Sequence, residues 1–392
     1  MINLTRLYND FRTASDGLRY PAGKEAFLKG RKPVVVWTMT KRCNLNCVHC
    51  YADAGRGVYN GELTLEEARI MLEDLARFGI PALLLSGGEP LTHPYFFQLA
   101  QTARDLGLRL TISTNGTLIS EEKAEAIKKV GITYVGISFD GLGEINDLFR
   151  GQKGAFEAAL KGLRSLKAVG QKVGLRFTLT QRNYAALNQI FEFVEQEKID
   201  RVCFYHLVYS GRGSQMSKDD LTHEQTRHAI DHILAWLRGL KEKNAPVEVL
   251  TVDNSVDGVY LYLKLQKENP TQAEEVYQLL GRNGGGANSS GLGIANIDSY
   301  GDVHPDQFWQ SYSLGNVKEK PFSEIWSDAG NSFLNNLRDR NQRLKGRCQT
   351  CRWKPLCGGS FRVRAFQATG DLWAEDPACY LSDEEVFAKN GR

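Results

Sequence analysis

Residues 33–53 read PVVVWTMTKRCNLNCVHCYAD, an apolar run followed at once by three closely spaced cysteines. A short run of β-branched and aromatic residues is typical of a buried strand. Cys43, Cys47 and Cys50 follow it in a CxxxCxxC pattern. Three thiols so close together indicate a metal-binding loop at the end of a strand, with one ligand position left open.

The spacing leaves three interpretations of this loop open. Structural zinc takes four ligands, and His49 inside the motif is a candidate fourth, although it is held between Val48 and Cys50. A cubane iron–sulfur cluster takes three cysteines and keeps its fourth iron free for another ligand. Thiols without metal are the third alternative. The spacing favours the cluster over the other two.

Strand and helix patterns alternate from residue 33 to about residue 207. The helical segments carry apolar residues at helical spacing. Thr64 and Ser120 stand at N-cap positions, and Glu67 completes a capping box with Thr64. Helices are predicted over 64–79, 93–107, 120–131, 153–170 and 184–198, between strands over 33–39, 81–88, 108–114, 133–140, 172–180 and 201–209.

This alternation predicts an α/β fold with a parallel sheet and right-handed crossovers. Six units are fewer than the eight of a closed barrel, so an open barrel and a doubly wound sheet both fit. Polar turns follow the strands, with the sequences SGGEP, STNGT, SFDGLG and YSGRG. Because active sites lie at the carboxyl ends of such strands, we expect these turns and the cysteine loop to form one site.

The composition limits the classes of partner. The 392 residues carry a formal net charge of +3, with both signs mixed along the chain, which argues against nucleic acid and membrane surfaces. The first residues contain no signal-peptide pattern, and no run of about 18 apolar residues predicts a membrane span. We expect a cytoplasmic protein, in which clustered cysteines indicate metal or redox chemistry more than disulfides.

The motif CNLNCVHC, followed by Tyr51, resembles that of the radical SAM superfamily, in which S-adenosylmethionine (SAM) binds the open iron of a 4Fe–4S cluster. The resemblance covers residues 33–210 and implies a partial (β/α)6 barrel. It implies that the GGEP motif meets the methionine amino group, with Glu89 holding the ammonium. The SAM-contacting positions implied are Tyr51, Gly87, Gly88, Glu89, Pro90, Ser113, Asn115, Ser138, Asp140, Arg176 and Thr178.

A second group of cysteines lies near the end of the chain, whereas Cys203 stands alone in an apolar strand and is expected in the core. Four thiols form either a zinc site or a fully ligated cluster. The segment resembles the SPASM extensions of radical SAM enzymes. This resemblance implies a second, auxiliary 4Fe–4S cluster that accepts or relays an electron. Its ligands are then Cys348, Cys351, Cys357 and Cys379.

The fuller SPASM pattern holds two auxiliary clusters, and this chain departs from it at three cysteine positions. Asn288 or a neighbour, Asp306 and Phe361 stand there instead. We therefore expect one auxiliary cluster, and space for a flat macrocycle over the barrel mouth where the other would lie. Asp306 or His304 would then face the substrate.

More narrowly, LYNDFRTASDGLRY, GDVHPDQFW and CGGSFRVRA resemble radical SAM enzymes that modify sirohaem-derived tetrapyrroles. The resemblance implies loss of two acetate side chains from didecarboxysirohaem, giving iron-coproporphyrin III, with ferredoxin or flavodoxin as electron donor. Alternatives are attack on propionate side chains, as in haem d1 formation, and a peptide-modifying maturase. Candidate proton donors or iron ligands are Tyr205, His206 and His304, and candidate carboxylate-binding residues are Arg212, Arg362 and Arg364.

Four regions are predicted along the chain. Beyond residue 215 we expect helices over 223–243 and 256–281, and a β-hairpin that turns at Ser299–Gly301, followed by a short helix from Phe322. The regions are an N-terminal extension over 1–32, the partial barrel over 33–215, a helical connection over 216–285, and a SPASM-like domain over 286–392.

Overall fold

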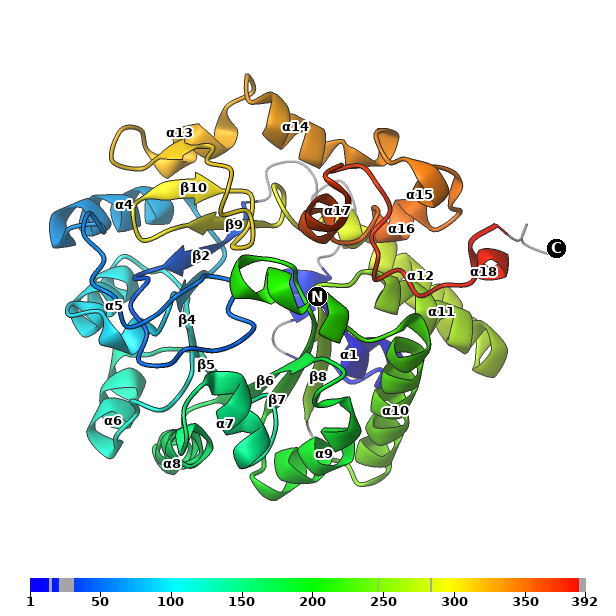
Figure 1. The fold of residues 1–392 in the computed structure, drawn as a ribbon, viewed down its shortest axis with the longest axis horizontal. Helices are drawn as coiled ribbons and strands as arrows, with labels where there is room; N and C mark the ends of the chain where they lie inside the picture. Colours follow the sequence, from blue (N-terminus) through cyan, green and yellow to red (C-terminus); the bar gives the residue numbers. More distant parts are fainter. Residues whose placement is uncertain (14–15, 21–31, 246, 283, 388–392) are drawn as a thin grey trace.

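A computed structural model describes residues 1–13, 16–20, 32–245, 247–282 and 284–387. Its centre is one continuous sheet with the strand order β1-β8-β7-β6-β5-β4-β3-β2-β9-β10-β11. The neighbours from β2 to β8 all run parallel. These strands curve around an open centre with helices outside them (Figure 1), which confirms the predicted partial barrel. They are β2 (Val34–Thr38), β3 (Leu83–Ser86), β4 (Leu110–Thr114), β5 (Tyr134–Ser138), β6 (Val173–Leu179), β7 (Arg201–His206) and β8 (Glu248–Val252).

The sheet is longer than the six predicted strands. Strand β8 lies inside the region expected to be helical, all of its residues are buried, and it pairs with β7. The other edge of β8 is covered by β1 (Ile2–Asn3), which runs antiparallel to β8. Because β8 belongs to the barrel sheet, the boundaries drawn at residues 215 and 285 divide one sheet and stay a prediction.

The hairpin of the C-terminal region continues the sheet at its opposite edge. Strand β9 (Ile294–Ile297) pairs parallel with β2, and β10 (Asp302–His304) pairs antiparallel with β9. The chain turns between them at the predicted residues, and β11 (Gly315–Asn316) pairs with β10. The C-terminal region is thereby attached to the barrel through the strand that leads into the cysteine loop.

The outer helices form where amphipathic spacing and caps predict them. Thr64 accepts a hydrogen bond from the Glu67 N–H, and the Glu67 side chain accepts one from the Thr64 N–H, which completes the capping box. Helix α7 (Glu144–Arg150) was not predicted. The others around the barrel are α4 (Leu65–Phe78), α5 (Phe96–Asp105), α6 (Glu121–Val130), α8 (Ala155–Ala168), α9 (Leu187–Gln196) and α10 (His223–Glu242).

The remaining helices form an arc along one side of the barrel (Figure 1). Helix α1 (Leu4–Asn9) packs on α10, and α2 (Asp16–Arg19) follows it in the chain. No helix among the described residues is long and apolar enough to cross a membrane. The arc consists of α11 (Val256–Glu268), α12 (Pro270–Arg282), α13 (Phe322–Ser327), α14 (Ser332–Arg338), α15 (Gly346–Thr350), α16 (Lys354–Cys357), α17 (Arg362–Thr369) and α18 (Asp383–Phe387).

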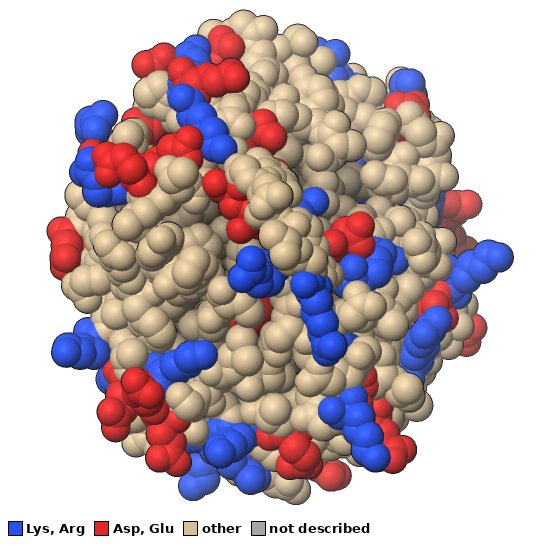
Figure 2. Space-filling view, turned by 60° about the vertical axis from the view of Figure 1, so that its left-hand side comes forward, with Lys and Arg blue, Asp and Glu red and all other residues tan. Residues whose placement is uncertain are grey.

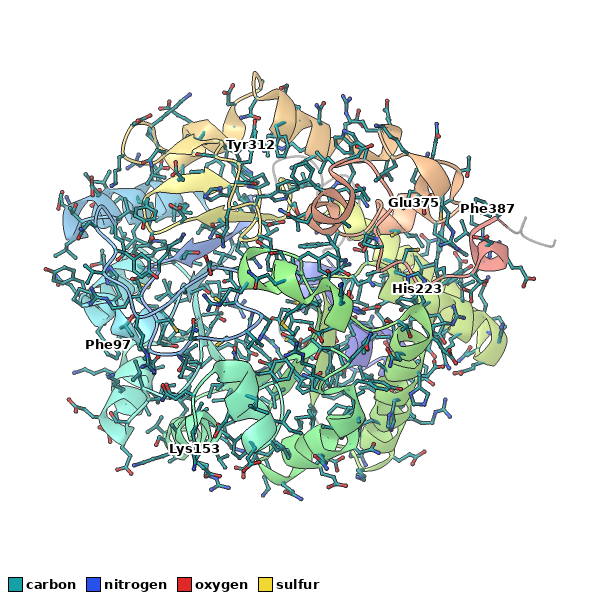
Figure 3. The ribbon with its side chains drawn as sticks, in the orientation of Figure 1. Phe97, Lys153, His223, Tyr312, Glu375 and Phe387 are labelled. Carbon is teal, nitrogen blue, oxygen red and sulfur yellow. The ribbon has the colours of Figure 1, made fainter. Side chains whose placement is uncertain are left out.

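The surface shows no block of one charge. On the face in Figure 2, Lys and Arg side chains alternate with Asp and Glu side chains over the outer helices. Several are paired, as Arg164 is with Glu197 and Lys243 with Glu195. Such exposed pairs contribute little stability, about 0–1 kcal/mol each. The interior, in contrast, is filled by side chains from the strands and helices (Figure 3).

Candidate active site

A cavity of about 1000 Å³, counting the space open to solvent, lies at the carboxyl ends of the parallel strands. The cysteine loop forms one side of it, the ends of β3 to β8 form the others, and Gln307 and Phe308 come from the hairpin region. The cavity therefore joins segments that are far apart in the sequence. Predicted residues that line it are Cys43, Cys47, Cys50, Tyr51, Gly87, Gly88, Ser113, Asn115, Ser138, Arg176, Thr178 and Tyr205.

The cysteine loop is held by main-chain hydrogen bonds and by one guanidinium. The Cys43 N–H donates to the Gly55 carbonyl at 2.7 Å. Arg212 donates to the carbonyls of Cys47 (2.8 Å) and Ala54 (2.9 Å), and pairs with Asp53 at 2.9 Å. Arg212 also lines the cavity, and its predicted role in binding substrate carboxylates stays a prediction.

Each thiol of the loop receives a hydrogen bond. The Leu45 and Ala54 amides donate to Cys43 and Cys50, both at 3.4 Å, and the Arg150 guanidinium donates to Cys47 at 3.7 Å. Burial raises the pKa of Cys43 to about 12. A metal deprotonates the thiols that bind it, and N–H donors stabilise the resulting charge. The donor set therefore suits a metal centre better than free thiols.

The cysteine loop provides three thiols on one segment. No three His, Cys, Asp or Glu side chains in the described part of the chain converge closely enough to ligate one metal ion. A 4Fe–4S cluster takes three cysteines and leaves its fourth iron open, and this donor set suits such a cluster.

Gly87 and Gly88 lie directly against the cysteine loop. A Cβ on Gly87 would stand 2.6 Å from the Thr40 carbonyl oxygen, and one on Gly88 would stand 2.3 Å from that of Arg42. The Gly88 N–H donates to the Thr40 carbonyl at 2.7 Å. Only glycine permits this approach. The pair leaves bare backbone on the cavity wall beside the thiols.

Asp140 organises the loop from behind rather than facing the cavity. Its carboxylate accepts from the Thr178 N–H at 2.9 Å and pairs with Arg150 and with His49, the latter at 3.2 Å. Burial alone would raise the pKa of Asp140, but the charges of Arg150 and His49 bring it well below its usual range. Asp140 thus holds Arg150 against Cys47. Asp140 does not line the cavity, and its predicted contact with SAM stays a prediction.

Two regions of the chain match known families. Residues 37–194 match the radical SAM superfamily, and residues 290–352 match the SPASM iron–sulfur cluster-binding domain. The chain is 52% identical over 396 aligned residues to the Fe-coproporphyrin III synthase of Methanosarcina barkeri, covering 98% of this chain and 99% of the relative. It belongs to the radical SAM superfamily.

Further relatives support the same assignment. The pre-heme d1 synthase of Dinoroseobacter shibae is 46% identical, covering 95% of this chain and 92% of the relative. Native anSMEcpe with bound AdoMet shares the fold, with a TM-score of 0.68 and 18% identity over 88% of this chain and 93% of the other. As a radical SAM enzyme with a SPASM domain, the chain uses SAM and two 4Fe–4S clusters, which confirms the cofactor prediction.

Glu89 of the radical SAM motif does not line the cavity. Its fully buried carboxylate accepts hydrogen bonds from Thr114 Oγ1 and the Asn115 N–H, both at 2.8 Å, and from the Leu91 N–H at 3.1 Å. These donors fix the ends of β3 and β4. The prediction that Glu89 holds the methionine ammonium stays a prediction, and Pro90, which begins the following turn, also lies off the cavity wall.

The other predicted positions of the radical SAM site do reach the cavity. Tyr51 shares a hydrogen bond with Ser86 Oγ at 3.2 Å, and Asn115 donates to Asn44 Oδ1 at 2.9 Å. Arg176 stacks over the Tyr205 ring at 4.6 Å and forms no ion pair with any described residue. Its guanidinium is therefore available to an anion in the cavity.

Two of the predicted proton donors are elsewhere. His206 bonds to Asp257 at 2.9 Å within the core, and His304 bonds to the Tyr312 carbonyl at 2.7 Å. Tyr312 lies with the hairpin above the ring of strands (Figure 3). Neither histidine lines the cavity, whereas Tyr205 does, and the roles predicted for all three stay predictions.

Arg362 and Arg364 are structural. Arg362 donates to the carbonyls of Leu372 (3.0 Å) and Ala374 (2.7 Å). Arg364 pairs with Asp376 at 2.7 Å, and both are buried. Neither arginine lines the cavity, and among the described residues the Arg362 Nε has no hydrogen-bond partner. Their predicted role toward substrate stays a prediction.

The four C-terminal cysteines are the predicted ligands of the second cluster. Cys357 lies deepest, and burial together with the other three thiols raises its pKa well above the ordinary value. The Trp353 N–H donates to Cys351 at 3.4 Å, and Arg347 donates to Cys379 at 3.6 Å. Four thiols close in space with N–H donors fit a fully ligated cluster. Cys203 packs against Leu250 and Val252 in the core, as predicted.

Side chains fill the space predicted for a macrocycle. Asp306 bonds to Ser290 and accepts from the Phe308 N–H at 2.8 Å. Arg340 is buried beside them and donates to the Ser290 carbonyl at 2.6 Å. Phe361 packs edge-on against Phe308 at 5.3 Å. Neither Asp306 nor His304 lines the cavity, and their predicted contact with the substrate stays a prediction.

Asp253 is one of the cavity residues that were missed from the sequence. Asp253 follows β8 directly and lines the cavity with a half-buried side chain. Because β8 was not recognised as a strand, the rule that functional residues follow parallel strands was not applied to it.

Proposed function

We propose that this radical SAM enzyme removes the two acetate side chains of didecarboxysirohaem and yields iron-coproporphyrin III. The observation that carries the proposal is the 52% identity to an Fe-coproporphyrin III synthase across essentially the whole of both chains. Three AdoMet-dependent heme synthases also match at lower identity, for example 33% over 88% of this chain. A tetrapyrrole substrate is thus common to these relatives.

The cavity provides the parts that this reaction needs. Cys43, Cys47 and Cys50 would hold the first cluster, and the Gly87–Gly88 backbone would lie along the bound SAM. When reduced, the bound cluster supplies the electron that converts SAM to methionine and a 5′-deoxyadenosyl radical. Ser113, Asn115 and Ser138 come from the strands next to β3 and extend the same wall.

The opposite strands would receive the tetrapyrrole. Arg176 on β6 has no ionic partner among the described residues, and its fork suits a side-chain carboxylate of the substrate. Leu207, Val208 and Phe308 add apolar surface for a flat ring. A ferredoxin or flavodoxin in the cytoplasm would supply the low-potential electrons.

The test is anaerobic incubation of the reconstituted enzyme with SAM, a reductant and didecarboxysirohaem. We expect 5′-deoxyadenosine, free acetate and a product with the mass of iron-coproporphyrin III. Absence of acetate in the presence of an active cluster would contradict the proposal.

A second candidate function rests on the 46% identity to a pre-heme d1 synthase. In that case oxo groups would replace propionate side chains, the acetate groups would stay on the product, and no acetate would be released. A peptide-modifying maturase is the alternative of another class. It would form 5′-deoxyadenosine with a peptide and not with the tetrapyrrole.

A further inference from the structure

Asp253 occupies a distinct position in the cavity. It follows β8, three strands beyond β5 in the sheet order, and so lies away from the Gly87, Ser113 and Ser138 wall. It is the only carboxylate among the cavity-lining residues, all of which the structure describes. Within the described part of the chain its carboxylate forms no hydrogen bond or ion pair, so it is available to a bound molecule.

The backbone of Asp253 is held in an unusual conformation. Its φ of 66° lies in the left-handed region, which Asp and Asn tolerate better than most residues. Arg364 donates to the Asp253 carbonyl at 2.9 Å while it pairs with buried Asp376. Non-glycine residues in this region cluster at functional sites, where surrounding contacts fix them. The C-terminal extension thus fixes the direction of the Asp253 side chain.

The surroundings of Asp253 favour its neutral form. Burial raises its pKa to about 6, although the amino terminus, Arg364 and Arg176 oppose the shift, and the charge of Asp306 adds to it. Tyr51 and Tyr205 also face it. A carboxyl with a pKa near neutrality holds a proton and can also release it, as a general acid requires.

The other titratable side chains of the cavity are less suited to this task. His49 is paired with Asp140, and Arg150 is paired with the same carboxylate. Burial raises the pKa of Tyr205 well above its ordinary value, so that its phenol is a much weaker acid than Asp253. The thiols are the cluster ligands.

We propose that Asp253 donates the proton that completes each released acetate, an inference that rests on the function proposed above. The deoxyadenosyl radical takes a hydrogen atom from the ring carbon next to the acetate-bearing carbon. Homolysis of the bond to the side chain then forms a ring C=C bond and a carboxymethyl radical. One electron from an iron–sulfur centre and one proton from Asp253 convert this radical into acetate, and solvent reprotonates the carboxylate.

The first experiment compares Asp253→Asn with the wild type under anaerobic turnover. Asn keeps the size and tolerates the left-handed backbone but has no acidic proton. We expect acetate release to fall about 100-fold, which is typical for loss of a general acid, and the ratio of 5′-deoxyadenosine to acetate to rise. Asp10→Asn is the matched control, because Asp10 also has a positive φ of 56° but is exposed and does not line the cavity.

Results that would overturn the inference are equally definite. Acetate release within threefold of the wild type in Asp253→Asn would exclude Asp253 as the donor. So would a parallel loss of 5′-deoxyadenosine and acetate, which would place its role before hydrogen abstraction. If the wild type releases no acetate, the proposed function is rejected. The inference about Asp253 is then rejected with it, without the variant comparison.

Two measurements on the wild type do not depend on how the variant folds. In deuterated buffer the released acetate should carry one solvent deuterium per molecule, whereas acetate without solvent deuterium would mean that no acid takes part. Acetate release should also decline as the pH rises through about 6, because the protonated form of Asp253 is lost there. A rate that is flat between pH 5 and pH 8 would contradict the inference.

Discussion

The two cysteine sites of this enzyme are built from the same side chain but closed in different ways. Cys43, Cys47 and Cys50 lie on one loop whose thiols line a cavity. Cys348, Cys351, Cys357 and Cys379 come from the helical arc around α15 and α16 and from a segment beyond α17. One site leaves a ligand position to a small molecule, and the other supplies all four ligands from the chain.

The difference in ligand number indicates a different chemical role for each site. A cluster with an open iron beside a cavity can bind and activate a molecule, whereas a cluster with four thiolates can only pass electrons. The protein supports both with an arginine that donates to one thiol, Arg150 at Cys47 and Arg347 at Cys379. Arg150 is buried and paired with buried Asp140, and Arg347 pairs with exposed Asp383.

The largest expected effect follows from removing a ligand of the open site, which is the loop of Cys43, Cys47 and Cys50. Cys43→Ala, Cys47→Ala or Cys50→Ala should each abolish 5′-deoxyadenosine formation, because the cluster that binds SAM is lost. The iron content should fall from about eight to about four per chain, since each cubane holds four. Iron analysis and chromatography of the nucleoside products measure both.

Cys203→Ala is the matched control for these variants, because Cys203 is a buried thiol of the core and not a ligand. It should keep about eight irons, four for each cubane. Deoxyadenosine formation at the wild-type rate in any of the three loop variants would refute the assignment of the open site.

The second prediction separates the two sites. Replacing Cys348 and Cys351 together by Ala should leave about four irons and retain SAM cleavage, but block acetate release because the second centre no longer passes electrons. Unchanged iron in the double variant would show that the ligands are assigned wrongly. About twelve irons in the wild type would show a third cluster, against the departures at Asp306 and Phe361.

The third prediction concerns the buried arginine. Arg150→Lys keeps the charge but cannot donate to both Cys47 and Asp140 in the same fork. Loss of such a supporting contact typically lowers activity about 10–100-fold, so SAM cleavage should fall by that factor with the iron retained. Arg164→Lys, at an exposed pair with Glu197, is the control and should be unchanged. An unaltered SAM cleavage rate in Arg150→Lys would remove the positioning role of the Asp140–Arg150 pair.

The open site was predictable from the sequence to the extent that local rules control it. The cysteine spacing, the glycines and the strand ends gave the residues of the cavity wall in their correct order. The side-chain directions of Glu89 and Asp140 were not predictable, because residue type does not show direction, and both carboxylates turn inward to donors from neighbouring strands. Buried carboxylates need such partners, which only the fold reveals.

The region around the closed site, which is the group of four C-terminal cysteines, was harder to predict because its contacts are distant in sequence. Strand β8 is five residues long between helices and pairs with β1 and β7, so that no local pattern distinguishes it from a connection. His206 and Arg364 carry functional residue types, but their partners Asp257 and Asp376 lie 51 and 12 positions along the chain. Asp253 was missed for the same reason as β8.

The smallest expected effect is at the arginine of the closed site. Arg347→Lys removes the donor to Cys379 and the pair with Asp383, whose side chain is 79% exposed. Exposed pairs of this kind contribute about 0–1 kcal/mol, so the free energy of unfolding in anaerobic denaturant titration should change by less than about 1 kcal/mol. The four thiolates close the cluster without the arginine, and the iron content and SAM cleavage should stay at wild-type values. Arg150→Lys is not expected to lose the first cluster. If Arg347→Lys lost the second cluster, the closed site would depend on its arginine more than the open site does. The conclusion that the closed site is held by its four thiolates, and that the open site depends on the residues around it, would then be wrong.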